Sequence, residues 1–128
     1  MVTIFAKTER MIKKNRQLTA NCLQYVVAVK DVQDIMNGKW KYSIAAALFY
    51  SGKMRFMELK NHINDISPKV LSSELKDLEM NHLVKRTVCN TKPITVEYEL
   101  TELGKSFNGI IEAMGVWGIK YRKSILNK

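Results

Sequence analysis

The sequence contains few residues that could hold a covalent or metal-bound scaffold together. Its 128 residues include two cysteines, Cys22 and Cys89, and two histidines, His62 and His82, and no two of them are close neighbours in the chain. None has the short spacing of a zinc site, and two distant cysteines do not build a disulfide-rich protein. We therefore expect no structural metal, no cofactor and no disulfide scaffold.

Long apolar segments and catalytic motifs are also missing. No stretch approaches the ~20 apolar residues that cross a bilayer, and residues 1–16 carry Lys, Glu and Arg where a signal peptide has an apolar segment. Neither a Gly-x-Ser-x-Gly motif nor a glycine-rich phosphate loop occurs. These absences predict a cytoplasmic protein without a membrane partner. They also predict that it is not an enzyme, because no pair of titratable groups is evident.

Positive charge is concentrated at the two ends of the chain. The hydrophobic share of 46% and the charged share of 26% are typical of one soluble domain, and the net charge is +9. Residues 1–30 hold six basic and one acidic side chain, residues 104–128 hold five and one, and the middle holds ten of each. The basic ends keep a small protein soluble, or they attract nucleic acid without sequence preference.

Helical spacing dominates the first half of the sequence. Steps of four and three predict a first helix with one apolar stripe, made of Leu18, Cys22, Tyr25, Val29, Val32 and Met36. Gly38 is a natural stop for this helix. A second helix is predicted from Trp40 to Phe49, and a short third helix carries Phe56, Leu59 and Ile63.

The fourth predicted helix follows a clear start signal. Ser67 is a natural N-cap, and Pro68 fits the first helical position because its missing N–H has no partner there. Placing residues 100° apart buries Leu71, Leu75 and Leu78. The opposite face is free of acidic residues and holds Lys69, Ser72, Ser73, Lys76 and Met80.

The apolar period changes from helical to two after residue 82. Residues 84–89 and 96–100 alternate as a β-hairpin does, and the loop 90–94 is polar. Thr101 is a plausible N-cap for a final helix. The apolar face of that helix is wider than a small core requires and carries Leu103, Phe107, Ile110, Ile111, Met114 and Trp117.

This order of elements is that of a winged helix-turn-helix, an α+β fold that is mainly α. We expect a DNA-binding core at residues 25–104, flanked by residues 1–24 and 105–128. A major groove about 12 Å wide admits one helix, and the hairpin then reaches the adjacent backbone or minor groove. The residues expected to contact DNA are Arg55, Ser67, Lys69, Ser72, Ser73, Lys76, Thr91 and Lys92.

Several segments, in order, resemble the HxlR family of bacterial transcription regulators. They are residues 34–40 (DIMNGKW), 55–59 (RFMEL), 66–71 (ISPKVL), 75–79 (LKDLE) and 96–104 (VEYELTELG). The resemblance implies a MarR-like homodimer whose first and last helices pair, on DNA with inverted half-sites about 34 to 36 Å apart. The interface it implies contains Leu18, Cys22, Tyr25, Val29, Phe107, Ile110, Ile111, Met114 and Trp117.

Two alternatives remain open at this point. Many members of the family have a cysteine thirteen residues before the Trp, a position that is Val27 here, so redox sensing does not carry over to a matching residue. Cys22 either packs as a small apolar side chain or acts as a redox group at the dimer axis. The alternative function is a winged-helix assembly module without DNA affinity, because the middle of the chain is electrically neutral.

Overall fold

The computed structural model describes residues 20–126, and helices account for most of them. The chain divides into two units, with the boundary between Gly38 and Lys39. Helix α2 (Ala20–Ile35) belongs to the first unit and the remaining elements to the second. Gly38 has a φ of 90°, a value that glycine adopts without steric cost, so the helix stop is confirmed. Within residues 20–126, no helix is both long and apolar enough to cross a membrane.

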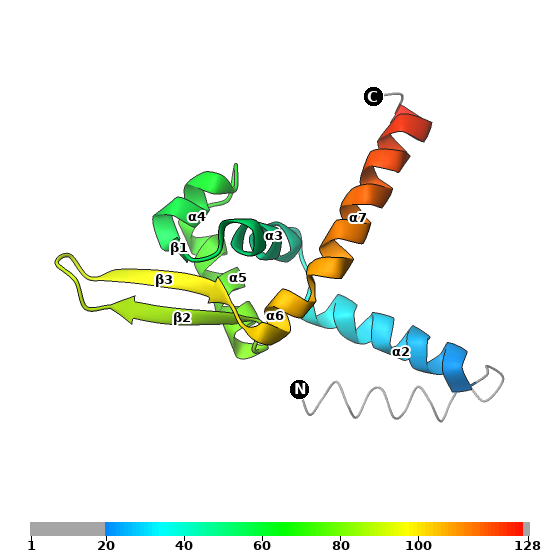
Figure 1. The fold of residues 1–128 in the computed structure, drawn as a ribbon, viewed down its shortest axis with the longest axis horizontal. Helices are drawn as coiled ribbons and strands as arrows, with labels where there is room; N and C mark the ends of the chain where they lie inside the picture. The colour runs from blue at the N-terminus through cyan, green and yellow to red at the C-terminus, as the bar shows by residue number, and fades with distance from the viewer. Residues whose placement is uncertain (1–19, 127–128) are drawn as a thin grey trace. The chain divides into compact units, whose positions relative to one another are not determined.

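Three helices form the centre of the second unit (Figure 1). They are α3 (Lys41–Ser51), α4 (Phe56–His62) and α5 (Pro68–Met80), and α3 contacts both of the others. Their largest fully buried side chains are Lys41, Ile44, Leu48, Leu59, Leu71, Leu75 and Leu78. Burial of the six apolar members stabilises this unit, because it removes their surface from water.

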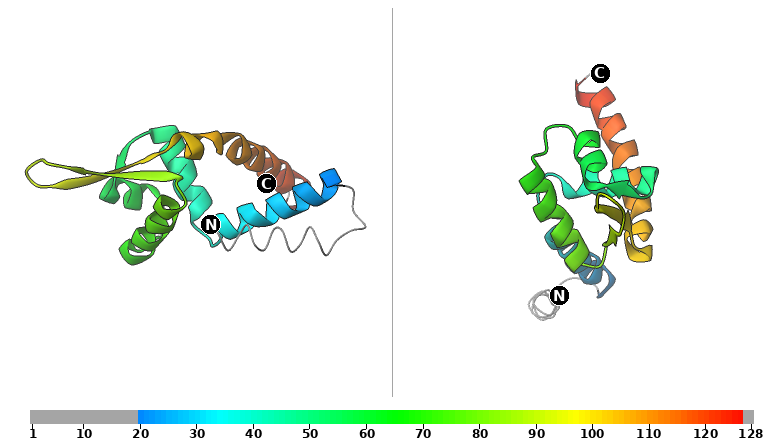
Figure 2. Two further views of the ribbon diagram at one scale, coloured as in Figure 1. Left: turned by 90° about the horizontal axis from the view of Figure 1, so that it is seen from below. Right: turned by 90° about the vertical axis from the view of Figure 1, so that its left-hand side faces the viewer.

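A three-stranded antiparallel sheet adjoins these helices. It contains β1 (Met54–Arg55), β2 (Val84–Cys89) and β3 (Thr95–Leu100) in the order β1-β3-β2. The predicted hairpin is confirmed, and its register places Val84 opposite Leu100. In Figure 2 the hairpin extends well beyond the helices of its unit. Strand β1 was not predicted, because two residues are too few to show a period of two.

The final helix is interrupted, whereas the sequence predicts one continuous helix. Helix α6 (Glu102–Ser106) is followed by α7 (Asn108–Tyr121) and a π-helical turn (Arg122–Leu126). At the break, the Phe107 N–H donates to the Gly104 carbonyl at 3.1 Å, which tightens the last turn of α6. The apolar positions keep helical spacing across this point, so the pattern gave no sign of a break.

Helix α6 is fixed against the turn that follows α5. The predicted N-cap is confirmed, since the Thr101 hydroxyl accepts from the Gly104 N–H at 3.0 Å. The same hydroxyl donates to the His82 carbonyl at 2.6 Å. A Cβ at Gly104 would lie 2.2 Å from the Leu83 carbonyl oxygen, so this close approach requires glycine.

Candidate nucleic-acid interface

Helix α5 is held by a cap at its start and by leucines along one side. The Ser67 hydroxyl accepts from the Val70 N–H at 3.2 Å, and Pro68 stands in the first turn, both as predicted. Leu71, Leu75 and Leu78 are buried. The opposite face is therefore turned to solvent by the packing of the leucines.

The predicted ridge of α5, defined as Lys69, Ser72, Ser73 and Lys76, is exposed along its whole length. Short hydroxyls and lysine ammonium groups can donate to base edges and to phosphates. The acidic residues of α5 lie away from this ridge: Glu79 stands on one flank, and Glu74 and Asp77 stand toward the other.

Sequence reasoning missed the partner of those last two acids. Lys41, in the first turn of α3, places its Nζ 2.8 Å from Glu74 Oε2 and 3.4 Å from Asp77 Oδ2. A signal was present, because Lys41, Ala45 and Leu48 follow helical spacing on the buried face of α3. A lysine on such a stripe requires a buried acidic partner.

The hairpin presents its own cations. Thr91 and Lys92 are exposed at the tip, as predicted, and the Thr91 hydroxyl donates to the Pro93 carbonyl at 2.8 Å. Lys85 and Arg86 of β2 are also exposed and were not predicted as contacts. Arg86 was overlooked because alternation with Val84 and Val88 assigned it to the apolar face.

Arg55 and Cys89 both lie near an acidic residue of β3. Arg55 is exposed at the start of α4, where its N–H donates to Glu58 Oε1 at 3.0 Å, and its register partner in β3 is Glu97. The Cys89 Sγ donates to Glu97 Oε1 at 2.5 Å. This hydrogen bond, followed by burial, raises the pKa of the Cys89 thiol, so the thiol stays protonated near neutral pH.

The predicted interface residues are largely exposed apolar side chains. On α2, Cys22, Tyr25 and Val29 are exposed, whereas the buried apolar residues Leu23 and Val27 lie beside that stripe. Leu18 lies outside the described residues.

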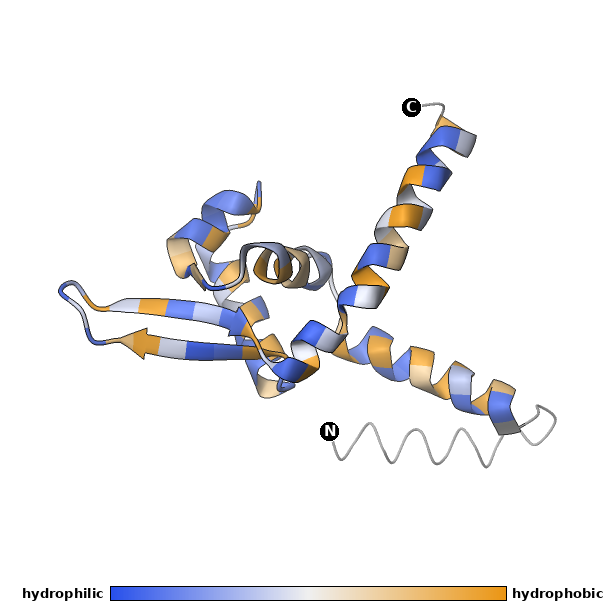
Figure 3. Ribbon diagram, viewed as in Figure 1, coloured by the Kyte–Doolittle hydropathy of each residue, from blue (hydrophilic) through white to orange (hydrophobic). Residues whose placement is uncertain are grey.

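On α7 no residue is buried, and the Trp117 side chain is 65% exposed. Ile110 and Met114 are exposed and Ile111 is half-buried, as is Phe107, which immediately precedes the helix. Figure 3 shows apolar residues recurring along this helix. Such a continuous apolar surface is typical of an interface with another protein chain.

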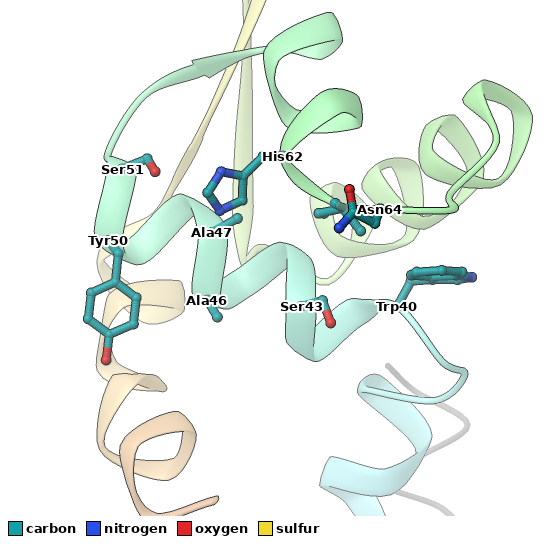
Figure 4. A pocket seen from close by; sticks show the side chains of 9 residues that line it. Trp40, Ser43, Ala46, Ala47, Tyr50, Ser51, His62 and Asn64 are labelled. Atoms are coloured by element: carbon teal, nitrogen blue, oxygen red, sulfur yellow. The ribbon is translucent and has the colours of Figure 1, made fainter. Parts of the chain in front are cut away.

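A groove of about 450 Å³ lies on another part of the second unit (Figure 4). Trp40 stands at one end and Tyr50 at the other, and His62 from α4 lies over Ala47. The remaining lining residues are Ser43, Ala46, Ser51, Ile63 and Asn64. None of the ridge residues lines it, so the groove is separate from the candidate interface. Within residues 20–126, no cluster of His, Cys, Asp and Glu could hold a metal ion.

Comparison with known proteins identifies the family. The HxlR-like helix-turn-helix family model matches residues 35–125. The chain is 37% identical over 98 residues to the HTH-type transcriptional regulator YtcD of Bacillus subtilis, covering 77% of each chain. It is 39% identical over 105 residues to an HTH-type transcriptional regulator of Halalkalibacterium halodurans, covering 76% of this chain and 93% of the relative.

Comparison with solved structures identifies the same family. The redox regulator HypR in its reduced form superposes with a TM-score of 0.72 at 32% identity, over 79% of this chain and 99% of HypR. The predicted winged helix-turn-helix and the predicted resemblance are thus both confirmed. The chain belongs to the HxlR-like helix-turn-helix family of transcription regulators, which are DNA-binding proteins rather than enzymes.

Proposed function

We propose that this chain is a cytoplasmic regulator that binds duplex DNA as a homodimer, with α5 of each copy in a major groove. The observation that carries the proposal is the exposed ridge of α5. It presents two lysines and two serines on a helix that is capped at Ser67 and anchored by buried leucines. A groove about 12 Å wide accepts one such helix.

The hairpin and the start of α4 supply phosphate contacts in this proposal. Lys92 and Thr91 at the tip reach the neighbouring backbone or minor groove, and Ser67 and Arg55 lie at the starts of α5 and α4. Contacts of this kind position the protein on DNA, while the ridge residues read base edges. Lys85 and Arg86 of β2 are further exposed cations, one on each face of the hairpin.

The dimer in this proposal forms through the helices on either side of the DNA-binding core. Residues 25–104 are the core, and residues 1–24 and 105–128 contribute to dimerisation. The support is the exposed apolar face of α7 and the exposed stripe of α2, in which Tyr25 is 74% exposed. A two-fold dimer reads inverted half-sites about one helical turn apart.

Binding to DNA upstream of its own gene, against a scrambled duplex of equal length, tests the proposal. We expect preferential binding that weakens steeply with salt, because phosphate contacts release counterions. The variant K76A should lose roughly tenfold in affinity, and its salt slope should fall by about one. The matched control is K105A, which removes the same charge from an exposed position on α6.

A dimer that binds neither duplex at low salt would favour the alternative, an assembly module. Equal binding of both duplexes by the wild-type protein and by K76A would contradict sequence reading by α5 and would reduce the interaction to bulk charge.

A redox role for Cys22 is part of the proposal. HypR is a redox regulator that has reduced and oxidised forms. If the α2 stripes meet at the dimer axis, two Cys22 thiols can form an intermolecular disulfide, giving two electrons and two protons to a peroxide, which becomes water and an alcohol or a second water. Peroxide-treated protein should then run as a dimer on a non-reducing gel, and the C22S variant should not. Monomeric wild type would leave Cys22 a packing residue.

A further inference from the structure

Lys41 is the one charged side chain buried among residues 20–126. It is 2% exposed, although it stands in the first turn of α3. Desolvating an ammonium group is costly, and an ion pair offsets that cost only when the geometry is good. Here one Nζ meets two carboxylates of α5 at 2.8 and 3.4 Å. Replacement of a whole buried ion pair by apolar residues of similar volume is often neutral or stabilising, so stability alone does not account for this lysine.

The two carboxylates lie on one side of α5, less than one turn apart. Glu74 is 17% exposed and Asp77 is 53% exposed. Because they are separated by three residues, a single cation that contacts both constrains rotation of α5 about its axis. Ser73 and Lys76 of the ridge are the residues that immediately precede Glu74 and Asp77.

Rotation of this helix matters for reading a base sequence. Side-chain ends lie about 5 Å from a helix axis, so a rotation of about 20° moves them by about 2 Å. Hydrogen bonds tolerate only a few tenths of an ångström in donor–acceptor distance. A small rotation of α5 would therefore break base contacts while leaving phosphate attraction largely intact.

The charge balance of α5 points the same way. The helix carries Lys69 and Lys76 against Glu74, Asp77 and Glu79, so alone it is negative. Lys41 pairs with Glu74 and Asp77, so their charges are compensated. The ridge lysines then face DNA with Glu79 as the remaining acidic residue of the helix. Lys41 itself is too deeply buried to touch a phosphate.

We propose that Lys41 is a positioning residue for DNA reading: it fixes the rotation of α5 through Glu74 and Asp77, and so sets operator specificity. The inference rests on the proposed function of α5. It adds a residue from a different helix, outside the DNA-contacting surface, to the determinants of specificity.

The decisive variant is K41M/E74Q/D77N. It removes the ion pairs between Lys41 and the two acidic residues of α5 without leaving an unpaired charge. We expect it to bind the scrambled duplex at least as tightly as the wild type, since the net charge rises by one. Its preference for the upstream duplex should fall about tenfold or more, the value of one good base contact. Among single variants, K41R keeps the positive charge and should therefore retain more of the preference for the upstream duplex than K41M does. An unchanged preference in the triple variant overturns the proposal.

A stability control and a DNA-free measurement complete the test. L48A removes a buried side chain from α3 without touching the acids of α5. It should keep the preference, and a loss equal to that of the triple variant would assign the effect to instability.

Without DNA, amide hydrogen exchange in α5 should become faster in the triple variant relative to the hairpin. Unchanged exchange would contradict the claim that the Lys41 ion pairs constrain α5. If the wild type bound no DNA but exchange in the variant were faster, the proposed function and the specificity role of Lys41 would both fail, while the constraint of Lys41 on α5 would stand.

Discussion

The DNA-facing region, meaning α5 and the β2–β3 hairpin, and helix α7 differ in what they expose. Helix α5 buries its three leucines and exposes polar residues. Helix α7 is richer in apolar residues, yet none of its residues is buried. A polar exposed face is stable in water until it meets DNA, whereas a continuous apolar face needs another protein surface.

The glycines of α7 strengthen this contrast. Gly115 and Gly118 lie inside the helix, and a Cβ at either would meet only open space. Glycine in a helix interior costs about 0.5–1 kcal/mol relative to alanine. Nothing in the described chain requires them, and close approach of a second helix would. The contrast is that the packing of α5 is complete within one chain, whereas the exposed apolar face of α7 supports the proposed dimer.

The largest expected effect comes from breaking the α7 face. We expect W117E to convert the dimer into a monomer, because a carboxylate in an apolar interface is not compensated. Loss of the second half-site should weaken operator binding by roughly 100- to 10,000-fold. Sedimentation equilibrium and DNA titration measure the two effects. E112Q, on the same helix, should leave both unchanged, and a W117E protein that stays dimeric would contradict the interface.

The complement of that experiment is to break the buried side of α5. L75A should lower the free energy of unfolding by about 2–5 kcal/mol, since Leu75 is 1% exposed and its loss leaves a cavity. M80A, on the exposed face, should change it by less than about 0.5 kcal/mol. Urea denaturation checks both. Equal effects of the two variants would mean that α5 is not oriented as described.

Local signals account for what the sequence predicted correctly. Ser67 and Pro68 mark the start of α5 through hydrogen bonds within one turn, and the hairpin shows its period over six residues per strand. The exposure of the ridge then follows from helix geometry alone. These features depend on neighbours in sequence, so a single chain reveals them.

The features that escaped prediction depend on distant partners. Strand β1 exists because Met54 pairs with Tyr98, and the break at Phe107 keeps the apolar spacing on both sides. Periodicity places Lys41 on the buried stripe of α3, but it does not identify Glu74, 33 positions away, as the partner. The dimer contacts of α2 and α7 stay predictions for the same reason, since the partner is another chain.

A smaller effect on the free energy of unfolding is expected at the cap of α5, and a ridge variant provides the comparison. S67A should lower the free energy of unfolding by about 1 kcal/mol, because the Val70 N–H loses its acceptor. S72A, on the ridge, should change unfolding by less than about 0.5 kcal/mol while weakening operator binding. If S72A were the more destabilising of the two, the ridge would be a packing surface rather than a reading surface.

The smallest effect concerns the Cys89 thiol, which has its hydrogen-bond partner, Glu97, within the same hairpin. Because the hydrogen bond to Glu97 raises the pKa of Cys89 in the folded state, folding favours the protonated thiol. Its stabilising contribution is complete below the unfolded pKa of about 8.5 and is lost as pH rises through the folded pKa. Between about pH 7 and about pH 10, C22S protein should therefore lose more stability than C22S/C89S protein. Identical losses in the two proteins would mean that the thiol does not donate to Glu97 in solution.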